Sequence, residues 1–257
     1  MTSRTPEYRT ACRRRILIGF GIHAVAGIIA LAGQPLVAFW GLNAAWALGI
    51  GSTLLPNDPL FGSIKRRTGL PKKIWITIDD GPDPETTPVL LDLLSKHQRS
   101  ATFFLIGERA VQHPDLVRSI CDAGHEVANH TQTHPQGRVW AHRPKRIWEE
   151  IAIAQATLQE ITGIVPRHLR APVGHTNPFV HPAAEELGLL VTGWTARGYD
   201  AVETDVDKIL TRIRKTLHPG GTLLIHDAVP HAPEVLEKVL EEIALIEEPE
   251  PTAACTS

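Results

Sequence analysis

Two short motifs hold the residues of this chain whose types and spacing could do chemistry. Asp79 and Asp80 close an apolar run, and His130 and His134 follow further along the chain. One carboxylate and two imidazoles are a full set of protein ligands for a catalytic zinc site, because such a site keeps its fourth position open for water. The other aspartate is then free to act as a base. The two motifs together predict a metal-dependent hydrolase.

Each motif also has a structural interpretation. Asp79 and Asp80 stand just before Asp83-Pro84-Glu85, which is typical of a helix start, so the pair could belong to a helix N-terminal turn. On the end of an extended strand, however, their side chains diverge, and one can bind a metal while the other faces the bound water. His130 and His134 are four residues apart, so we expect a helical turn that presents both imidazoles on one face.

The elements that must position these residues alternate along the chain from about Lys72 onwards. Alternating strands and helices are typical of a parallel sheet, open or closed into a barrel. The expected strands are 74–78, 101–106, 126–129, 168–171, 189–194 and 222–226, and the expected helices lie near 87–96, 109–123, 144–162, 178–187, 206–217 and 233–246.

The polar residues of interest share one position relative to these strands. Asp79 and Asp80 end the first expected strand, His130 the third, Arg170 the fourth, Trp194 the fifth and His226 the sixth. Active sites of parallel folds lie at the carboxyl ends of the strands. The shared position therefore favours one site that collects all of these side chains.

The front of the chain is apolar, with no Asp, Glu, Lys or Arg from Ile16 to Asn57. The run divides at Gln34-Pro35 into two segments, each long enough as a helix to cross a bilayer. We interpret it as a transmembrane helical hairpin rather than a cleaved signal peptide or a pair of buried core helices. Arg13-Arg14-Arg15 precedes it and Lys65-Arg66-Arg67 follows it. The positive-inside rule then places both ends, and the catalytic domain, in the cytoplasm at a bacterial inner membrane.

Length and composition limit the classes of protein to which the chain could belong. The 257 residues carry a net charge of −2, with no basic cluster interleaved with aromatics, so nucleic acid is not an expected partner. Three scattered cysteines form no disulfide framework.

We expect a basic segment at 1–15, membrane helices at 16–57, a linker at 58–71, a catalytic domain at 72–246 and a disordered tail at 247–257.

The motifs resemble those of the polysaccharide deacetylase family, also called the NodB-homology domain or carbohydrate esterase family four. The resemblance covers roughly residues 72–245 and includes four motifs in the family's order. They are Trp75-Ile76-Thr77-Ile78-Asp79-Asp80 with Gly81-Pro82, then Gly124-His125-Glu126-Val127-Ala128-Asn129-His130-Thr131-Gln132-Thr133-His134, then Arg170-Ala171-Pro172-Val173-Gly174, and finally Leu224-Ile225-His226. The resemblance implies a distorted parallel (β/α) barrel that hydrolyses an N-acyl group, usually acetyl, from an amino sugar.

The family's site residues carry over to the matching positions. The resemblance implies that Asp80, His130 and His134 hold a divalent metal, usually zinc. Asp79 would be the general base and His226 the general acid. The metal would polarise the amide carbonyl, and the histidine could protonate the departing amine near neutral pH.

Further residues complete the implied site. Arg170 would orient Asp79, and the backbone N–H of Val173 would help to stabilise the oxyanion. Leu224 would line an apolar pocket for the acyl methyl, and Trp194 could line the substrate groove. The chain departs from the family at Val173, where an aromatic residue is common, and around Asp200, where the motif is altered. Asp200 is the expected carboxylate that tunes His226.

These expectations combine into a membrane-anchored, metal-dependent amino-sugar N-deacylase. A cytoplasmic domain would meet a glycan at the inner face of the membrane, such as a lipid-linked sugar, and acetyl is not distinguished from formyl. A haloacid-dehalogenase-like phosphatase is an alternative because it also opens on a strand-end aspartate, although it would leave the His pair unused. A non-catalytic carbohydrate-binding membrane protein is a third interpretation, which the presence of both Asp79 and His226 disfavours.

Overall fold

A computed structural model describes residues 5–67, 69, 72–135 and 138–247 of the chain. By their contacts the residues form two compact units, Met1–Lys65 with Asn129–Gly193 and Arg66–Ala128 with Trp194–Ser257. The strands follow the order β5-β4-β3-β2-β1-β7-β6, and the pairings within each unit are parallel. A parallel sheet whose strands alternate with helices confirms the expected α/β class.

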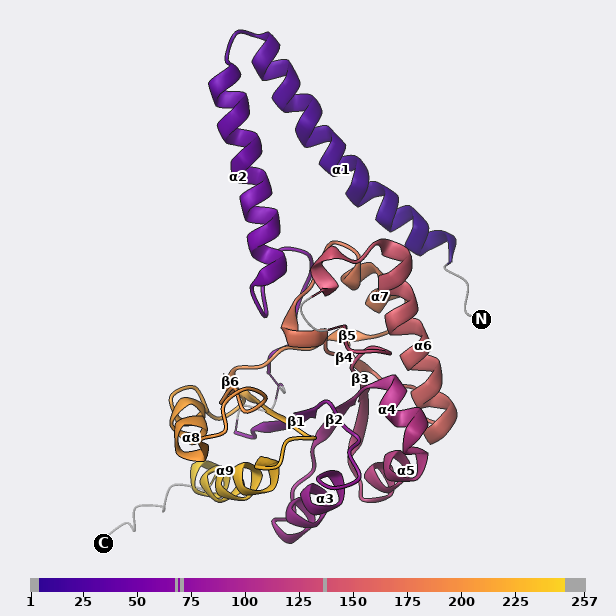
Figure 1. Cartoon of the computed structure of the whole chain (residues 1–257), viewed down its shortest axis with the longest axis vertical. Coiled ribbons are helices and arrows are strands. Elements are labelled where there is room, and N and C mark those ends of the chain that lie inside the picture. Colours follow the sequence, from indigo (N-terminus) through magenta and orange to yellow (C-terminus); the bar gives the residue numbers. More distant parts are fainter. Residues whose placement is uncertain (1–4, 68, 70–71, 136–137, 248–257) are drawn as a thin grey trace, which may run out of the picture. The chain divides into compact units, whose positions relative to one another are not determined.

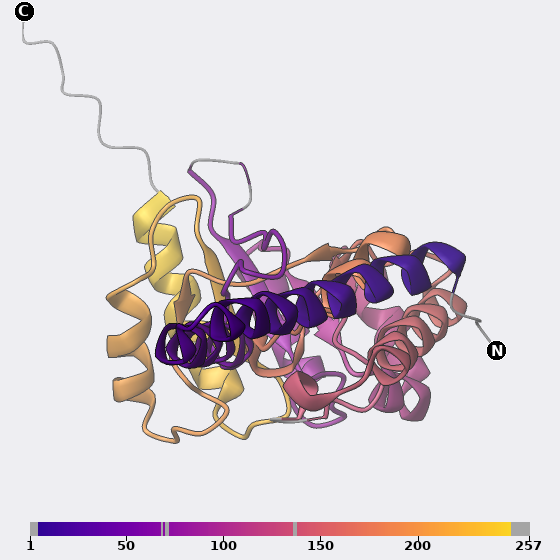
Figure 2. The same cartoon turned by 90° about the horizontal axis from the view of Figure 1, so that it is seen from above.

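In the second unit, Arg66–Ala128 with Trp194–Ser257, the central strand is β1 (Trp75–Asp79), with β2 (Thr102–Leu105) on one side and β7 (Thr222–His226) on the other. These strands are apolar and almost wholly buried, as strands covered on both faces must be. The helices of this unit are α3 (Thr87–Lys96), α4 (Gly107–Gln112), α5 (Pro114–Asp122), α8 (Val206–Arg214) and α9 (Ala232–Glu247), of which α8 and α9 lie side by side (Figures 1 and 2).

In this unit one expected helix was wrong and one strand was not expected. The helix expected at 109–123 is divided at His113, because Pro114 cannot donate the backbone hydrogen bond that would continue α4 and instead begins α5. The strand β6 (Ala196–Arg197), parallel to β7, was not expected, since two residues carry no periodic pattern.

The first unit, Met1–Lys65 with Asn129–Gly193, contains the short strands β4 (His168–Leu169) and β5 (Leu190–Val191), and β3 (Glu126–Asn129) ends within it. Its long helix α6 (Pro144–Thr162) ends at Gly163, whose φ of 72° is the left-handed conformation that favours glycine. The shorter α7 (Val180–Glu186) packs against α6. The strand expected at 189–194 is observed as β5, Leu190–Val191, so Trp194 lies beyond the end of the strand.

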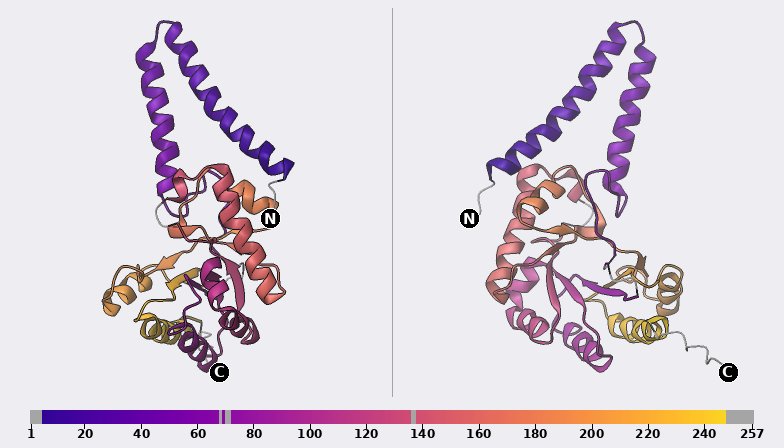
Figure 3. Two further views of the ribbon diagram at one scale, coloured as in Figure 1. Left: turned by 45° about the vertical axis from the view of Figure 1, so that its right-hand side comes forward. Right: turned by 180° about the vertical axis from the view of Figure 1, so that it is seen from behind.

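Two long helices, α1 (Pro6–Leu31) and α2 (Pro35–Leu54), also belong to the first unit and meet at a turn from which they diverge (Figure 3). Both are long and apolar enough to cross a membrane. Their large apolar side chains are exposed, among them Phe20 at 68% and Trp40 at 67%. The alternative of two buried core helices is therefore wrong. Between the helices, Trp46 Nε1 donates to His23 Nε2 at 3.3 Å, whereas Asn43 bonds within its own helix.

The start of α1 is packed against the rest of the first unit. Tyr8 and Cys12 are 1% and 5% exposed and join an apolar core cluster with Trp148, Val191 and other residues of α6, α7 and β5. The Tyr8 hydroxyl donates to the carbonyl of Pro144 at 2.7 Å, and its ring lies 4.9 Å from that of Trp148. The segment 1–15 therefore contains packed residues as well as basic ones.

The expected linker and tail fall partly on described residues. Lys65 bonds to the backbone of Val191 and Gly193 beside β5, so this part of the expected linker pairs with the fold. Glu247 was expected in the tail, but it ends α9 and accepts from the backbone N–H of Ile74 at 2.7 Å. Residues 68, 70, 71 and 248–257 lie outside the described residues, and the remaining boundaries stay predictions.

Candidate active site

The aspartate pair stands at the end of β1. Asp79 is the last residue of the strand and is 2% exposed, while Asp80 turns the chain with φ of 73°. The left-handed conformation at Asp80 directs the two side chains differently, and such conformations persist where the surrounding structure holds them. Here the backbone N–H of Asp227 donates to the carbonyl of Asp79 at 2.8 Å, and Arg109 Nη1 donates to the carbonyl of Asp80 at 2.8 Å.

Asp227 is a buried carboxylate that the sequence reasoning missed. It accepts hydrogen bonds from the hydroxyls of Thr86 and Thr87, and burial raises its pKa while these bonds oppose the rise. A Cβ on Gly81 would lie 2.6 Å from its Oδ2, so only glycine allows this approach. Asp227 thus ties the turn after β1 to the end of β7. Its place directly after a strand-end histidine was the available signal.

His226 ends β7, directly opposite Asp79 in the strand register. Asp200 holds it twice, because its carboxylate lies 3.0 Å from His226 Nδ1 and accepts from the His226 backbone N–H at 2.6 Å. Burial lowers the pKa of His226, but the hydrogen bond and charge of Asp200, with the charges of Asp79 and Asp80, outweigh burial and raise it to about 9. The contact expected between Asp200 and His226 is present, and its role in tuning stays a prediction.

His130 and His134 lie in a loop after β3 rather than on the helical turn that their spacing suggested. The loop turns at Thr131 and His134, whose φ values are 69° and 47°, and it brings the two ring centroids to 4.7 Å from each other. His130 Nδ1 lies 2.8 Å from the carbonyl of Arg170. Because a carbonyl can only accept, Nδ1 carries the proton and Nε2 is the nitrogen that can bind a metal.

The donor set fits a divalent metal. Among the residues that the structure describes, Asp80, His130 and His134 form a group whose ligand atoms all lie within 4.8 Å of one another. One carboxylate and two imidazoles match the ligands of catalytic zinc sites. The carbonyl that holds His130 Nδ1 is the usual outer partner of a metal-binding histidine.

The four other residues that were expected in the site differ in burial and in their contacts. Arg170 is 1% exposed and donates to the carbonyl of Gly193 at 2.9 Å, and its expected pairing with Asp79 stays a prediction. Val173 is exposed and has φ of 59°, which is strained for a β-branched residue. Trp194 is 7% exposed, with the guanidinium of Arg197 4.9 Å from its ring centroid, and Leu224 is buried in β7. The roles given to these residues also stay predictions.

Comparisons with known proteins agree with these motifs. Residues 66–192 match the family model described as polysaccharide deacetylase. A chitooligosaccharide deacetylase of Bradyrhizobium sp. (strain ANU 289) is 35% identical over 63% of this chain and 74% of its own length. The peptidoglycan-N-acetylglucosamine deacetylase PgdA of Listeria monocytogenes serotype 1/2a (strain 10403S) is 32% identical over 61% of this chain and 32% of its own length.

One solved structure shows that this fold also occurs in a pseudoenzyme. The CE4 family pseudoenzyme BA3943 from Bacillus anthracis superposes with a TM-score of 0.66 at 26% identity, over 71% of this chain and 64% of its own. Because a pseudoenzyme shares the fold, the fold alone does not establish catalysis. The identity to the Bradyrhizobium protein and the share of its length that is covered do establish the family. The chain belongs to the polysaccharide deacetylase family, carbohydrate esterase family 4.

Proposed function

We propose that this protein is a metal-dependent hydrolase that removes an N-acyl group, such as acetyl, from an amino sugar. The observation that carries the proposal is the grouping of Asp80, His130 and His134 as a three-ligand set that includes the aspartate directly after β1. The family and the deacetylase relatives support the reaction type. They give no support to the haloacid-dehalogenase-like alternative, which would also leave the His pair unused.

Asp80, His130 and His134 are the residues that would hold the metal, for which zinc is the first choice. A divalent ion there would supply a Lewis acid that polarises the acyl carbonyl and makes water more acidic. Asp79, the neighbour of a ligand, would take a proton from the attacking water. Arg170 would keep the Asp79 carboxylate oriented. Leu224 and Trp194 would line the space for the acyl methyl and the sugar.

Collapse of the tetrahedral intermediate requires a proton for the departing amine. His226 is the donor we propose, because Asp200 holds its ring and keeps it protonated at neutral pH. The negative oxygen of the intermediate needs a fixed hydrogen-bond donor, and the backbone N–H of Val173 would provide it. The strained φ of Val173 agrees with a backbone held for such a purpose, since strain of this kind collects at functional sites.

The substrate can be tested with the base variant Asp79→Asn. Glycolipid and cell-wall fractions from cells that make the wild-type protein or the variant are compared by mass spectrometry. The expected result is that one acyl mass per sugar is lost with the wild type and retained with the variant, in one fraction only. The size of the lost group distinguishes acetyl from formyl. Identical fractions, with both proteins present at equal levels, would favour a non-catalytic carbohydrate-binding protein.

We propose that α1 and α2 anchor the protein in the bacterial inner membrane, with the catalytic domain in the cytoplasm. The exposed apolar side chains of both helices and the basic residues on either side of the hairpin support this topology. The substrate would then be a glycan carried on a lipid at the inner face. A reporter fused to the C-terminus that is active only in the periplasm should stay silent, and activity of that reporter would refute the orientation.

A further inference from the structure

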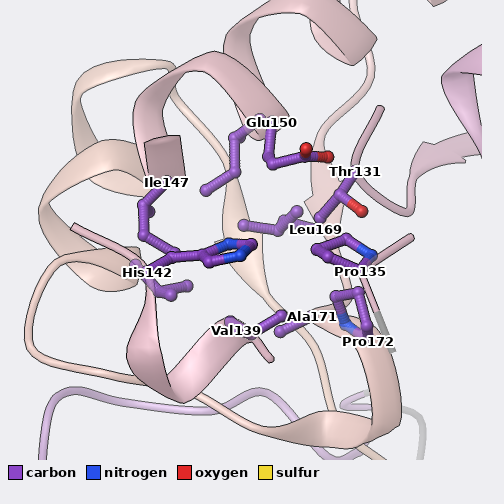
Figure 4. A pocket seen from close by; sticks show the side chains of 11 residues that line it. Thr131, Pro135, Val139, His142, Ile147, Glu150, Leu169, Ala171 and Pro172 are labelled. Carbon is purple, nitrogen blue, oxygen red and sulfur yellow. The ribbon is translucent and has the colours of Figure 1, made fainter. Parts of the chain in front are cut away.

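The loop that contains His130 and His134 has little regular structure of its own to hold it. Thr131 and His134 both have left-handed φ values, which cost free energy for residues other than glycine unless the surroundings compensate. Behind the loop lies a pocket lined mainly by apolar side chains, among them Val139, Leu169 and Pro172 (Figure 4). Apolar walls offer no partner for the polar backbone of the loop, so its conformation must be fixed from elsewhere.

Two side chains fix the ends of the loop, Asn129 of β3, which is itself held by α6, and Glu150 of α6. At the beginning, Asn129 Oδ1 accepts from the backbone N–H of Thr131 at 2.9 Å, and Asn129 Nδ2 donates to Ile151 and Gln155 of α6. At the far end, Glu150 Oε2 accepts from the backbone N–H of Thr133 at 2.8 Å. Glu150 Oε1 accepts from the Thr133 hydroxyl, also at 2.8 Å. Thr133 directly precedes His134.

Glu150 is unusual for a residue of α6 because its carboxylate is buried. The residue is 2% exposed, and the only side-chain cation paired with it among the described residues is Arg146, at 2.5 Å. Burying a carboxylate costs free energy, and apolar side chains often replace a buried ion pair without loss of stability. A core position filled for stability alone would not need this group. In Figure 4 the carboxylate reaches the rim of the pocket beside Thr131 rather than its centre.

From this geometry we propose that Glu150 is a positioning residue for the metal centre. Its two oxygens hold Thr133 at the backbone and at the side chain, and this fixes the orientation in which His134 presents its imidazole. The inference rests on the proposed function, since it takes His134 to be a metal ligand. Outer partners that orient metal ligands typically contribute about 10- to 100-fold to metal affinity. Glu150 would act on His134 indirectly, through the peptide that joins Thr133 to His134.

The test measures zinc binding by the full-length protein in detergent, by competition with a chromophoric chelator. Glu150→Ala is expected to weaken zinc affinity by about 10- to 100-fold. Glu150→Gln keeps one acceptor for Thr133 and should fall between Ala and the wild type. Glu149→Ala is the matched control, because Glu149 is the neighbouring residue of α6, is more exposed and pairs only weakly with Lys145 at 3.6 Å. This control should bind zinc as the wild type does.

A second pair of variants separates positioning from folding. Thr133→Val removes the hydroxyl that Glu150 holds, and Thr133→Ser restores it. Zinc affinity should fall in the first and recover in the second, while the thermal unfolding midpoint of the metal-free protein changes little in either. If Glu150→Ala and Thr133→Val bind zinc as tightly as the wild type, the positioning role is refuted and the metal site survives. If the wild type itself binds no zinc, the proposed metal dependence fails as well.

Discussion

The residues proposed for catalysis are held in place in two different ways. Asp79 and His226 end the paired strands β1 and β7 and stand opposite each other in the register. His130 and His134 lie in an irregular loop whose ends are fixed by the side chains of Asn129, at the end of β3, and Glu150, on α6. Backbone pairing positions the first set directly, whereas the second set depends on side-chain hydrogen bonds, and Glu150 lies well away from the loop in the sequence. The two sets should therefore respond differently to substitution.

The largest expected effects distinguish the base from a ligand. In Asp79→Asn we expect the rate of deacylation to fall by about 10²- to 10⁴-fold, the usual contribution of a positioned acid or base, while zinc remains bound. In His134→Ala, zinc affinity itself should fall by more than about 100-fold, because even the outer partners of ligands contribute up to that amount. Zinc content after gel filtration and initial rates on an N-acetylated chito-oligosaccharide measure the two effects.

Glu126→Gln serves as a control for both variants, because Glu126 begins β3 at the opposite end from His130. It should retain both zinc and activity. If Asp79→Asn loses zinc as completely as His134→Ala does, the division of roles between the two carboxylates is wrong. Asp79 would then be a ligand rather than a base.

A smaller effect should be visible in the pH profile of Asp200→Asn. Asp200 is the main group that keeps the pKa of His226 high, at about 9 in the wild type, against the opposing effect of burial. His226 must be protonated to donate, so activity is lost as the pH rises through its pKa. Without the Asp200 charge the pKa falls, and the basic limb of the profile of kcat should move to lower pH.

The matched control is Glu203→Gln, a carboxylate of the same segment that pairs with Arg212 at 3.1 Å. Its basic limb should coincide with that of the wild type. A basic limb that stays in place in Asp200→Asn would show that His226 is not the group titrating there, and the assignment of the general acid would have to change.

The same contrast explains what the sequence could and could not predict. Strand-end residues were found because a short apolar run followed by a polar residue defines both the strand and the edge at which it ends, as for Asp79 and His226. The α/β class followed from the same alternation. The conformation of the histidine loop was wrong, because spacing of four favours a helical turn only when local hydrogen bonds decide. Here the local bond from Thr131 to Asn129 favours a turn instead of a helix, and the bonds from Thr133 to Glu150, which is distant in the sequence, fix the rest of the loop.

Short elements and long-range contacts were missed for related reasons. The strand β6 has two residues, Ala196 and Arg197, and exists because β7 pairs with it. Asp227 was not singled out, because its partners Thr86 and Thr87 are far away in sequence. The division at His113 was available in principle from Pro114. The buried side chains at the start of α1, Tyr8 and Cys12, were hidden by the basic residues around them, Arg9 and Arg13-Arg14-Arg15.

The smallest expected effect tests whether the loop-bearing unit includes the start of α1. Tyr8→Phe removes the hydroxyl that donates to the carbonyl of Pro144 at the first turn of α6, but keeps the ring against Trp148. The loss of one buried hydrogen bond should destabilise folding by about 0.5–1.5 kcal/mol. The measurement is the thermal unfolding midpoint of the full-length protein in detergent, which should fall by a few degrees.

Thr10→Ala is the control for this variant, since the Thr10 hydroxyl donates within α1, to the carbonyl of Pro6, and not to another element. Its unfolding midpoint should match that of the wild type. If Tyr8→Phe also matches, the hydrogen bond to Pro144 does not contribute to stability, and only the packing of the Tyr8 ring would join the start of α1 to α6. If the midpoint falls, α1 is a part of the unit that carries His130 and His134. Its removal in a shortened protein would then weaken the support of α6, and through Glu150 and Asn129 that of the histidine loop.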